Sequence, residues 1–195
     1  VDRYLDAAAS SANRAAALTR RLLTFARRQS LNVTVVDVNC MVRSMEELLR
    51  GTVGAHAHLE IELEEGLSAV CTDEHQLENA LLNLVINARD AVPVGGRLCV
   101  RSRSLTLVTQ KEGLLPGDYV QLSVEDNGCG IAQDVIDQVF DPFFTTKPVG
   151  QGTGLGLSMV YGFTRQTGGH VQIDSTEGQG TRVHLHLPCG EATVA

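Results

Sequence analysis

The stretch from Asp73 to Ala91 constrains the fold more than any other, because it combines an apolar helix with a row of amides. Asn79, Asn83 and Asn87 follow one another at four-residue intervals, which places them on one face of a helix. Six of the other positions are leucine, valine or isoleucine, which indicates that the helix is largely buried. A buried amide without a hydrogen-bond partner costs about 1–3 kcal/mol. The row favours a polar ligand or hydrated metal at this face over hydrogen bonds to neighbouring backbone.

The other apolar patterns predict an α+β fold. Asn39 is expected to cap a helix that runs to Arg50 and stops at Gly51, and Asp73 to cap the helix that follows. Because helices and strands do not alternate regularly, we expect a two-layer α/β sandwich. Helices would cover one face of a mixed sheet, and a long N-terminal helix would precede it. Further helices are expected over residues 3–29, 132–139 and 155–167, and strands over residues 33–38, 58–64, 97–107, 119–125, 171–175 and 182–187.

Charge and composition argue against several classes of protein. The chain carries 16 lysines and arginines against 23 acidic residues, a net charge of −7, which argues against a general nucleic-acid binder. It has no apolar run long enough to span a bilayer, and its N-terminus does not resemble a signal peptide. The five cysteines are odd in number and widely spaced, which indicates free thiols in a reducing cytoplasm. His184 and His186 share one strand face, which favours a solvated face over a metal pair.

Two glycine-rich segments stand where backbone could approach a ligand. The first runs from Asp126 to Gly130 directly after an expected strand, although many ordinary turns look similar. The second, Gly150 to Ser158, opens a helix, where successive N–H groups and the helix dipole form a cradle for an anion. Between them, Phe140 to Lys147 places three of the five phenylalanines beside the glycine-rich loop. This indicates either a mobile lid whose lysine reaches phosphate oxygens or an ordinary hydrophobic plug.

Taken in this order, the segments resemble the ATP-binding catalytic domain of bacterial sensor histidine kinases. That domain shares a superfamily with the ATP-binding part of DNA gyrase, heat-shock chaperones and the MutL repair proteins. The resemblance covers about residues 33 to 188. The N box, the first glycine box, the F box, the second glycine box and the last glycine motif correspond to residues 83–88, 126–130, 140–144, 152–156 and 178–181.

The resemblance implies ATP and Mg²⁺ as cofactors and assigns a role to each matching residue. Asn87 would coordinate Mg²⁺ with the assistance of Asn83, and Asp126 would read the adenine amine. Lys147 and the backbone amides of the second glycine box would hold the phosphates, and Asn83 and Lys147 would also serve the catalytic step. The other nucleotide-binding residues implied are Asp90, Gly128, Gly130, Ile131, Phe140, Phe144, Gly152, Thr153, Gly154, Leu155, Gly156 and Thr181.

Position 83 separates the subfamilies. The ATP-hydrolysing relatives place a glutamate there as general base for water, whereas Asn83 cannot accept a proton. This favours transfer of the γ-phosphate to a histidine over hydrolysis. The alternatives are an ATP-gated clamp ATPase, a nucleotide-sensing module without catalysis and a serine kinase of the anti-sigma type. Asp90 resembles the chaperone and repair pattern, but it also occurs in kinases of this broad type.

The N-terminal segment resembles the second helix of the kinases' dimerisation hairpin. We expect this partial hairpin over residues 1–31, the catalytic domain over 32–188 and a tail over 189–195. No histidine lies between Val1 and Ala55, so the phosphoacceptor would be absent and the chain would not autophosphorylate. The resemblance implies three associations: with a histidine-containing dimerisation domain of the same protein, with a response regulator receiver domain, and as a homodimer at full length. Whether the parent protein is anchored in a membrane stays open.

Overall fold

The computed structural model describes residues 31–110, 113–148 and 152–190. The chain divides into two units, residues 1–31 and 32–195. The expected helix over residues 3–29 therefore lies outside the described residues, and so does most of the expected tail. None of the described helices is long and apolar enough to cross a membrane.

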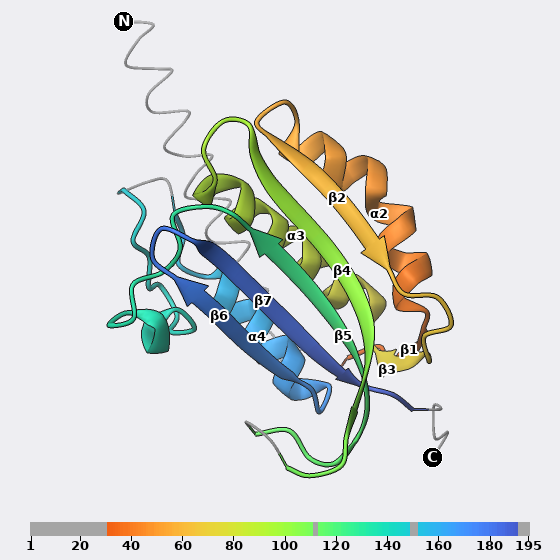
Figure 1. Cartoon of the computed structure of the whole chain (residues 1–195). Helices are drawn as coiled ribbons and strands as arrows, with labels where there is room; N and C mark the ends of the chain where they lie inside the picture. The colour runs from red at the N-terminus through yellow and green to blue at the C-terminus, as the bar shows by residue number, and fades with distance from the viewer. Residues whose placement is uncertain (1–30, 111–112, 149–151, 191–195) are drawn as a thin grey trace, which may run out of the picture. The chain divides into compact units, whose positions relative to one another are not determined.

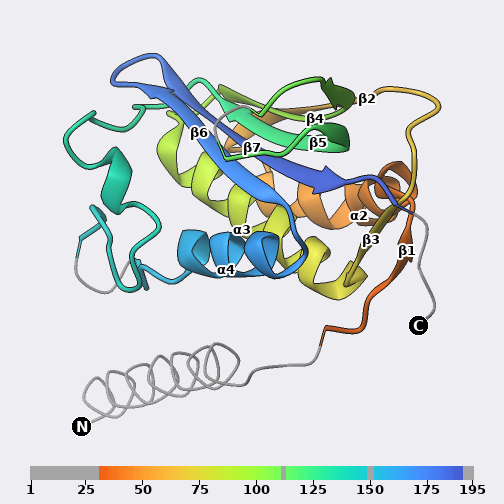
Figure 2. The same ribbon diagram turned by 90° about the horizontal axis from the view of Figure 1, so that it is seen from below.

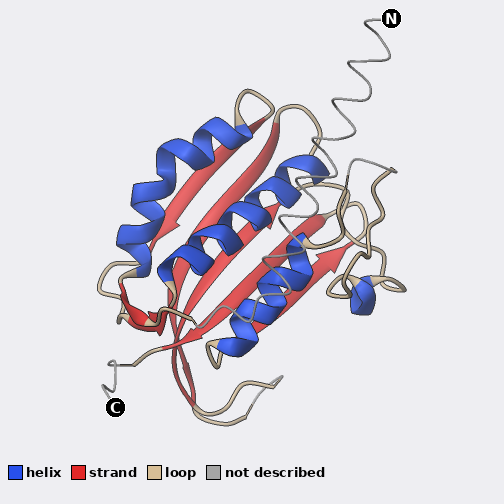
Figure 3. Ribbon diagram, turned by 180° about the vertical axis from the view of Figure 1, so that it is seen from behind, coloured by secondary structure: helices blue, strands red, loops and turns tan. Residues whose placement is uncertain are grey.

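The second unit is built on a five-stranded sheet with the order β2-β4-β5-β7-β6 (Figure 1). β2 runs parallel to β4, and all other neighbours are antiparallel, so the sheet is mixed as expected. The three α-helices of the described residues lie against one face of the sheet, which confirms the two-layer α+β sandwich (Figures 2 and 3). The strands are β2 Ala57–Leu63, β4 Gly96–Leu107, β5 Gly117–Asp126, β6 His170–Thr176 and β7 Gly180–Pro188; the helices are α2 Val38–Val53, α3 Glu74–Ala91 and α4 Gly156–Gln166.

The alternation of buried and outward-facing side chains along the strands explains the two layers. Val120, Leu122 and Val124 alternate along β5 and are fully buried against the helices, while the residues between them face outward. α3 buries Leu77 and Leu81 completely in the same core. Each such leucine contributes roughly 2–3 kcal/mol of apolar burial. This core holds the end of α3 and the end of β5 in fixed relative positions.

The prediction for α2 was wrong at both ends. Asp37, not Asn39, caps the helix, because its carboxylate oxygen accepts the N–H of Cys40 at 2.9 Å. Asn39 is buried inside the helix, where its amide donates to the carbonyl of Glu64 and accepts from Ser102. The helix continues through Gly51 and ends at Gly54, whose φ of 58° suits glycine.

Two shorter elements also differ from the sequence predictions. The expected strand over residues 33–38 shrinks to β1 Thr34–Val36, which pairs with an unpredicted three-residue strand, β3 Val70–Thr72. The expected helix over residues 132–139 is a single 3₁₀ turn, η1 Ile136–Gln138. None of the residues of this turn is buried, and a short helix without a packed face is marginal in water.

Candidate functional site

Two of the three asparagines on α3 converge with the start of α4. Gly156 is the first residue of α4, and a Cβ placed on it would lie 3.6 Å from Asn87 Nδ2 and 3.7 Å from Asn83 Oδ1. Asn79 is exposed, and its amide donates to the carbonyl of His75 at 2.8 Å. The alternative of bonding to neighbouring backbone therefore holds for Asn79, while Asn83 and Asn87 face the glycine-rich helix start.

Asp126 stands at the end of β5, held by the turn that follows it. Its Oδ1 accepts the N–H of Gly128 at 2.8 Å. Burial raises the pKa of Asp126, and hydrogen bonds from the backbone N–H groups of Gly128 and Thr181 offset only part of that rise. A Cβ on Gly128 would lie 2.4 Å from the carbonyl oxygen of Ala91, at the end of α3. Only glycine therefore lets the turn lie this close to the asparagine helix.

Ser175 joins the segments around Asp126, and the sequence reasoning missed it. Its Oγ accepts the N–H of Ile131 at 2.8 Å, donates to the carbonyl of Gly180 at 3.1 Å and lies 2.9 Å from Thr181 Oγ1. The register of β6 and β7 pairs Ser175 with Thr181. A hydroxyl directly opposite the threonine of the last glycine motif was the signal that could have identified it. A groove opens beside these residues and Asp126.

The two ends of the loop between Phe140 and α4 lie side by side. The N–H of Phe143 donates to the carbonyl of Gly154 at 2.8 Å, and Phe143 has a φ of 69°. A Cβ on Gly154 would lie 2.3 Å from the carbonyl carbon of Phe143, so the pairing requires glycine there. The ring of Phe140 packs 5.2 Å from that of Tyr161 on α4, an anchor at the base of the loop. Phe143 itself is 57% exposed.

The remaining predicted residues lie along the same loop. The N–H of Phe144 donates to the carbonyl of Asp141 at 3.1 Å, which closes a turn at the start of the loop. Leu155 is completely buried ahead of α4, and its N–H approaches Thr153 Oγ1 at 3.4 Å. Gly152 lies against Lys147, since a Cβ on it would be 3.2 Å from that side chain's Cβ.

Lys147 reaches across to α3. Its Nζ lies 2.7 Å from Asp90 Oδ2, and Arg89 Nη2 lies 2.6 Å from Asp90 Oδ1. Burial alone would raise the pKa of Asp90, but the hydrogen bonds and charges of Lys147 and Arg89 hold it below its ordinary value. The loop and the asparagine helix are thus joined by an ion pair in this structure.

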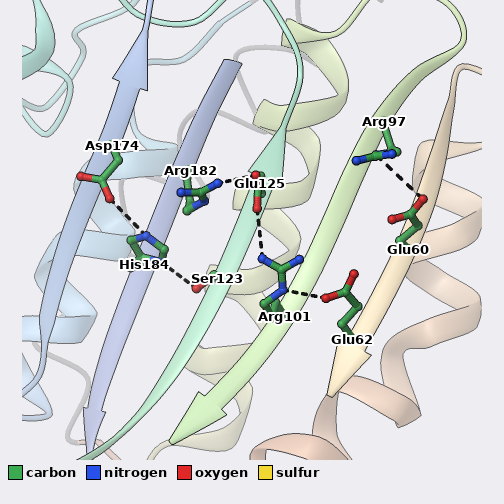
Figure 4. A network of polar contacts seen from close by, with 9 residues as sticks. All are labelled: Glu60, Glu62, Arg97, Arg101, Ser123, Glu125, Asp174, Arg182 and His184. Atoms are coloured by element: carbon green, nitrogen blue, oxygen red, sulfur yellow. Dashed lines mark hydrogen bonds and ion pairs between the residues drawn. The ribbon is translucent and has the colours of Figure 1, made fainter. Parts of the chain in front are cut away.

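The outer face of the sheet carries a polar network (Figure 4). Arg101 contacts Glu62 at 2.8 Å and Glu125 at 3.3 Å, and Arg182 contacts Glu125 at 2.5 Å. Glu60, Glu62 and Cys99 are the one group among the described residues whose positions could hold a metal ion. Arginines already pair with both of these carboxylates, Arg97 with Glu60 and Arg101 with Glu62. All five cysteines are free, as expected.

The histidine pair lies on the same face of the sheet and fits neither sequence interpretation. His184 contacts Ser123 Oγ at 2.6 Å and Asp174 Oδ2 at 3.3 Å. His186 is only 2% exposed, with its Nε2 3.0 Å from Gln121. Burial, together with the neighbouring His184 and His170, lowers the pKa of His186 to about 4. The two rings stay neutral between neighbouring strands rather than lying on a solvated face.

Comparison with known proteins gives this fold and site a family. Residues 72–191 match the family model of histidine kinase-, DNA gyrase B- and HSP90-like ATPases. The chain belongs to this family.

Among curated relatives, the sensor kinase CckA of Brucella abortus (strain 2308) is 45% identical over 182 residues, which cover 91% of this chain and 19% of that protein. The sensor histidine kinase ZraS of Escherichia coli (strain K12) is 33% identical over 181 residues, which cover 92% of this chain and 36% of that protein. The chain therefore spans well under half the length of either relative.

Solved structures give the same result. Full-length ShkA in complex with AMPPNP superposes with a TM-score of 0.77 at 26% identity, covering 98% of this chain and 39% of that one. The nucleotide-free catalytic domain of the histidine kinase ThkA superposes with a TM-score of 0.63 at 27% identity, covering 81% of this chain and 96% of that one. The fold is that of a histidine kinase ATP-binding domain.

Proposed function

We propose that this chain binds Mg-ATP and donates the γ-phosphate to a histidine on a dimerisation helix, within two-component signalling. The observation that carries the proposal is the convergence of Asn83 and Asn87 on Gly156, where α4 begins. The two side-chain amides and a helix N-terminus meet there, and such groups would suit a hard cation and a phosphate.

The donor types fit the implied ligands. Asn87 and Asn83 would hold Mg²⁺, which when bound neutralises phosphate charge. The backbone N–H groups between Gly152 and Gly156 would hold the phosphates. Asp126 would accept a hydrogen bond from the exocyclic amine of adenine, in a pocket shaped by Gly128, Gly130 and Ile131. Lys147 would also hold the phosphates, and Phe140, Phe144, Thr153, Leu155 and Thr181 would support these contacts.

Position 83 supports transfer over hydrolysis. An asparagine side chain cannot take a proton from water, so an attacking water would find no general base at this position. The acceptor must then bring its own nucleophile, which a histidine imidazole does. The alternative is a clamp ATPase, although the ATP-hydrolysing relatives carry a glutamate where this chain has Asn83, and the experiment below separates the two.

The partners follow from the same proposal. Relatives named as sensor kinases support a histidine-containing dimerisation domain in the same protein and a response regulator receiver domain as later acceptor. The full-length protein would be a homodimer, with residues 1–31 as the second helix of the hairpin and residues 32–188 as the catalytic domain.

The proposal is tested by calorimetric titration with Mg-ATP while phosphate release is followed in the same sample. Asp126→Asn should abolish most binding, whereas Asp118→Asn, at the far end of β5, should leave it unchanged. Adding a purified dimerisation hairpin of the full-length protein should then yield phosphohistidine. Steady phosphate release without transfer would favour the clamp ATPase, and absence of binding would overturn the proposal.

A further inference from the structure

We propose that Asp90 is a positioning residue that holds Lys147 on α3 in the nucleotide-free chain, and that Lys147 exchanges Asp90 for the phosphates when ATP binds. This inference rests on the proposed function. It assigns to Asp90 a role before binding, in place of the direct nucleotide contact that the family resemblance implies. The geometry that carries it is the 2.7 Å contact between Lys147 Nζ and Asp90 Oδ2.

The ion pair joins the two parts that must meet around a nucleotide. Asp90 follows Asn87 by three residues on α3, so it lies close to the proposed Mg²⁺ ligands along the helix. Lys147 belongs to the loop whose ends are tied together between Phe143 and Gly154. Lys147 also supports the returning end of the loop, since a Cβ on Gly152 would lie 3.4 Å from its Cδ. The position of this one side chain therefore affects the packing at Gly152 as well as the contact with α3.

The surroundings of Asp90 keep the free-energy cost of losing Lys147 low. Its two oxygens are shared between two cations, with Arg89 on Oδ1 and Lys147 on Oδ2. When Lys147 leaves, Arg89 stays and still neutralises the carboxylate. Arg89 is held independently, because its Nη1 donates to the carbonyl of Thr52 at 3.2 Å. Asp90 is thus not left as an unpaired charge after the lysine departs.

The pair is also weak enough to be displaced. Both side chains are about one-third exposed, 33% for Lys147 and 29% for Asp90. Exposed pairs of this kind contribute little, because water screens their attraction. A polyphosphate carries several negative charges and offers the ammonium group a stronger partner. Lys147 should therefore rest on Asp90 only while no phosphate is present.

The small number of lysines allows the environment of Lys147 to be measured directly. Lys111 and Lys147 are the only lysines in the sequence. Reductive ¹³C-methylation keeps the positive charge and gives each lysine a separate NMR signal. Lys111→Arg identifies the signal of Lys147. In the nucleotide-free chain, Asp90→Asn should move this signal to the position of an unpaired lysine, and Asp90→Glu should restore it. Glu78→Gln, which removes another carboxylate from α3, should leave it unchanged.

Addition of Mg-ATP should then bring the Lys147 signals of the wild-type chain and Asp90→Asn to a common position. In calorimetry, Asp90→Asn should tighten Mg-ATP binding by about two- to fivefold, as expected for release of an exposed pair. That gain in affinity should disappear when the chain already carries Lys147→Met. The coupling between the two substitutions separates an ion pair from simple repulsion between Asp90 and the phosphates.

Three results would overturn the inference while leaving the proposed function intact. A Lys147 signal that ignores Asp90→Asn in the nucleotide-free chain would show that the pair does not exist in solution. Weaker Mg-ATP binding by Asp90→Asn would show that Asp90 acts in the bound state. Equal effects with and without Lys147 would show that the two residues act separately. Absence of Mg-ATP binding by the wild-type chain would instead overturn the proposed function and the exchange with it, while the nucleotide-free signals would still decide the pair.

Discussion

Gly156 stands directly opposite Asn87, with 3.6 Å between a Cβ placed on the glycine and the amide nitrogen of the asparagine. This distance is an ordinary van der Waals contact, so the fold itself does not require glycine at this position. The space matters only if a ligand occupies it. The contact therefore indicates that glycine at position 156 serves ligand binding rather than the stability of the fold.

Gly156→Ala should fold normally but bind Mg-ATP about tenfold more weakly or worse, because the methyl group would project between the asparagines and the helix start. Gly162→Ala is the matched control on α4, since a Cβ there meets nothing within 4 Å. It should stabilise the chain by about 0.5–1 kcal/mol without changing affinity. Calorimetry and urea unfolding of both variants decide the matter. Equal affinity for both would place the phosphates elsewhere.

Gly130→Ala should destabilise the chain more than Gly178→Ala, although both glycines have positive φ, 70° and 77°. The backbone strain of about 1–2 kcal/mol is common to the two substitutions. At Gly130 the new Cβ would also lie 2.1 Å from the carbonyl oxygen of Thr176, whereas Gly178 has open space. The additional loss should be about 1–3 kcal/mol in urea unfolding. Equal losses would contradict close packing between the turn after Asp126 and the end of β6.

Ser175→Ala should cost about 1–3 kcal/mol, because it leaves the N–H of Ile131 and the carbonyl of Gly180 without their shared partner. Ser175→Thr keeps the hydroxyl and should recover most of the loss. We also expect Ser175→Ala to weaken Mg-ATP binding, since the segment after Asp126 loses the hydrogen bond from Ile131 to Ser175. Urea unfolding measures the first effect and calorimetry the second. Full stability in Ser175→Ala would show that water replaces the hydroxyl.

Stability should fall as the pH drops from about 6.5 toward 4, because of the neutral histidines on the outer face. Burial lowers the pKa of His186 from 6.5 to about 4, and it lowers that of His184 as well. In that pH window the unfolded chain binds protons that the folded chain does not bind. The free energy of unfolding is therefore highest above the window and falls as the pH drops through it. The loss from His186 should approach about 3 kcal/mol at the acid end.

Urea unfolding between pH 7.5 and 5 checks this, and His186→Gln should flatten the dependence. The carboxylates affect the stability mostly below this pH range. The lowered pKa of Asp90 and of Glu125 means that their contributions are lost only as the pH falls below their ordinary values. The raised pKa of Asp126 has the opposite effect on stability. The cost of ionising this buried carboxyl group in the folded chain grows as the pH rises through the acid range. An unchanged slope in His186→Gln would exclude His186 as the source.

Local patterns predicted much of the fold. The cap at Asp73 and the apolar spacing predicted α3, and the structure confirms it as Glu74–Ala91 with Asp73 accepting the N–H of Gln76. The apolar pattern predicted a strand over residues 119–125, which the structure confirms within β5. These features depend on residues a few positions apart, so the sequence alone carries the information. The predictions for α2 and residues 132–139 failed where a competing cap or the lack of a packed face decided the outcome.

Part of the candidate site was likewise predicted from the sequence, and part was decided only by the tertiary structure. The order of its motifs determined from sequence which segments would meet, and the converging residues Asn83, Asn87 and Gly156 were all named from sequence. Only the tertiary structure decided that Asn79 turns away, that Ser175 joins the turn to β7, and that Lys147 contacts Asp90, which lies 57 residues before it. Such contacts depend on the strand register and on the packing of α3 against the loop. No local pattern encodes them, because the partners become neighbours only once the whole sheet has formed.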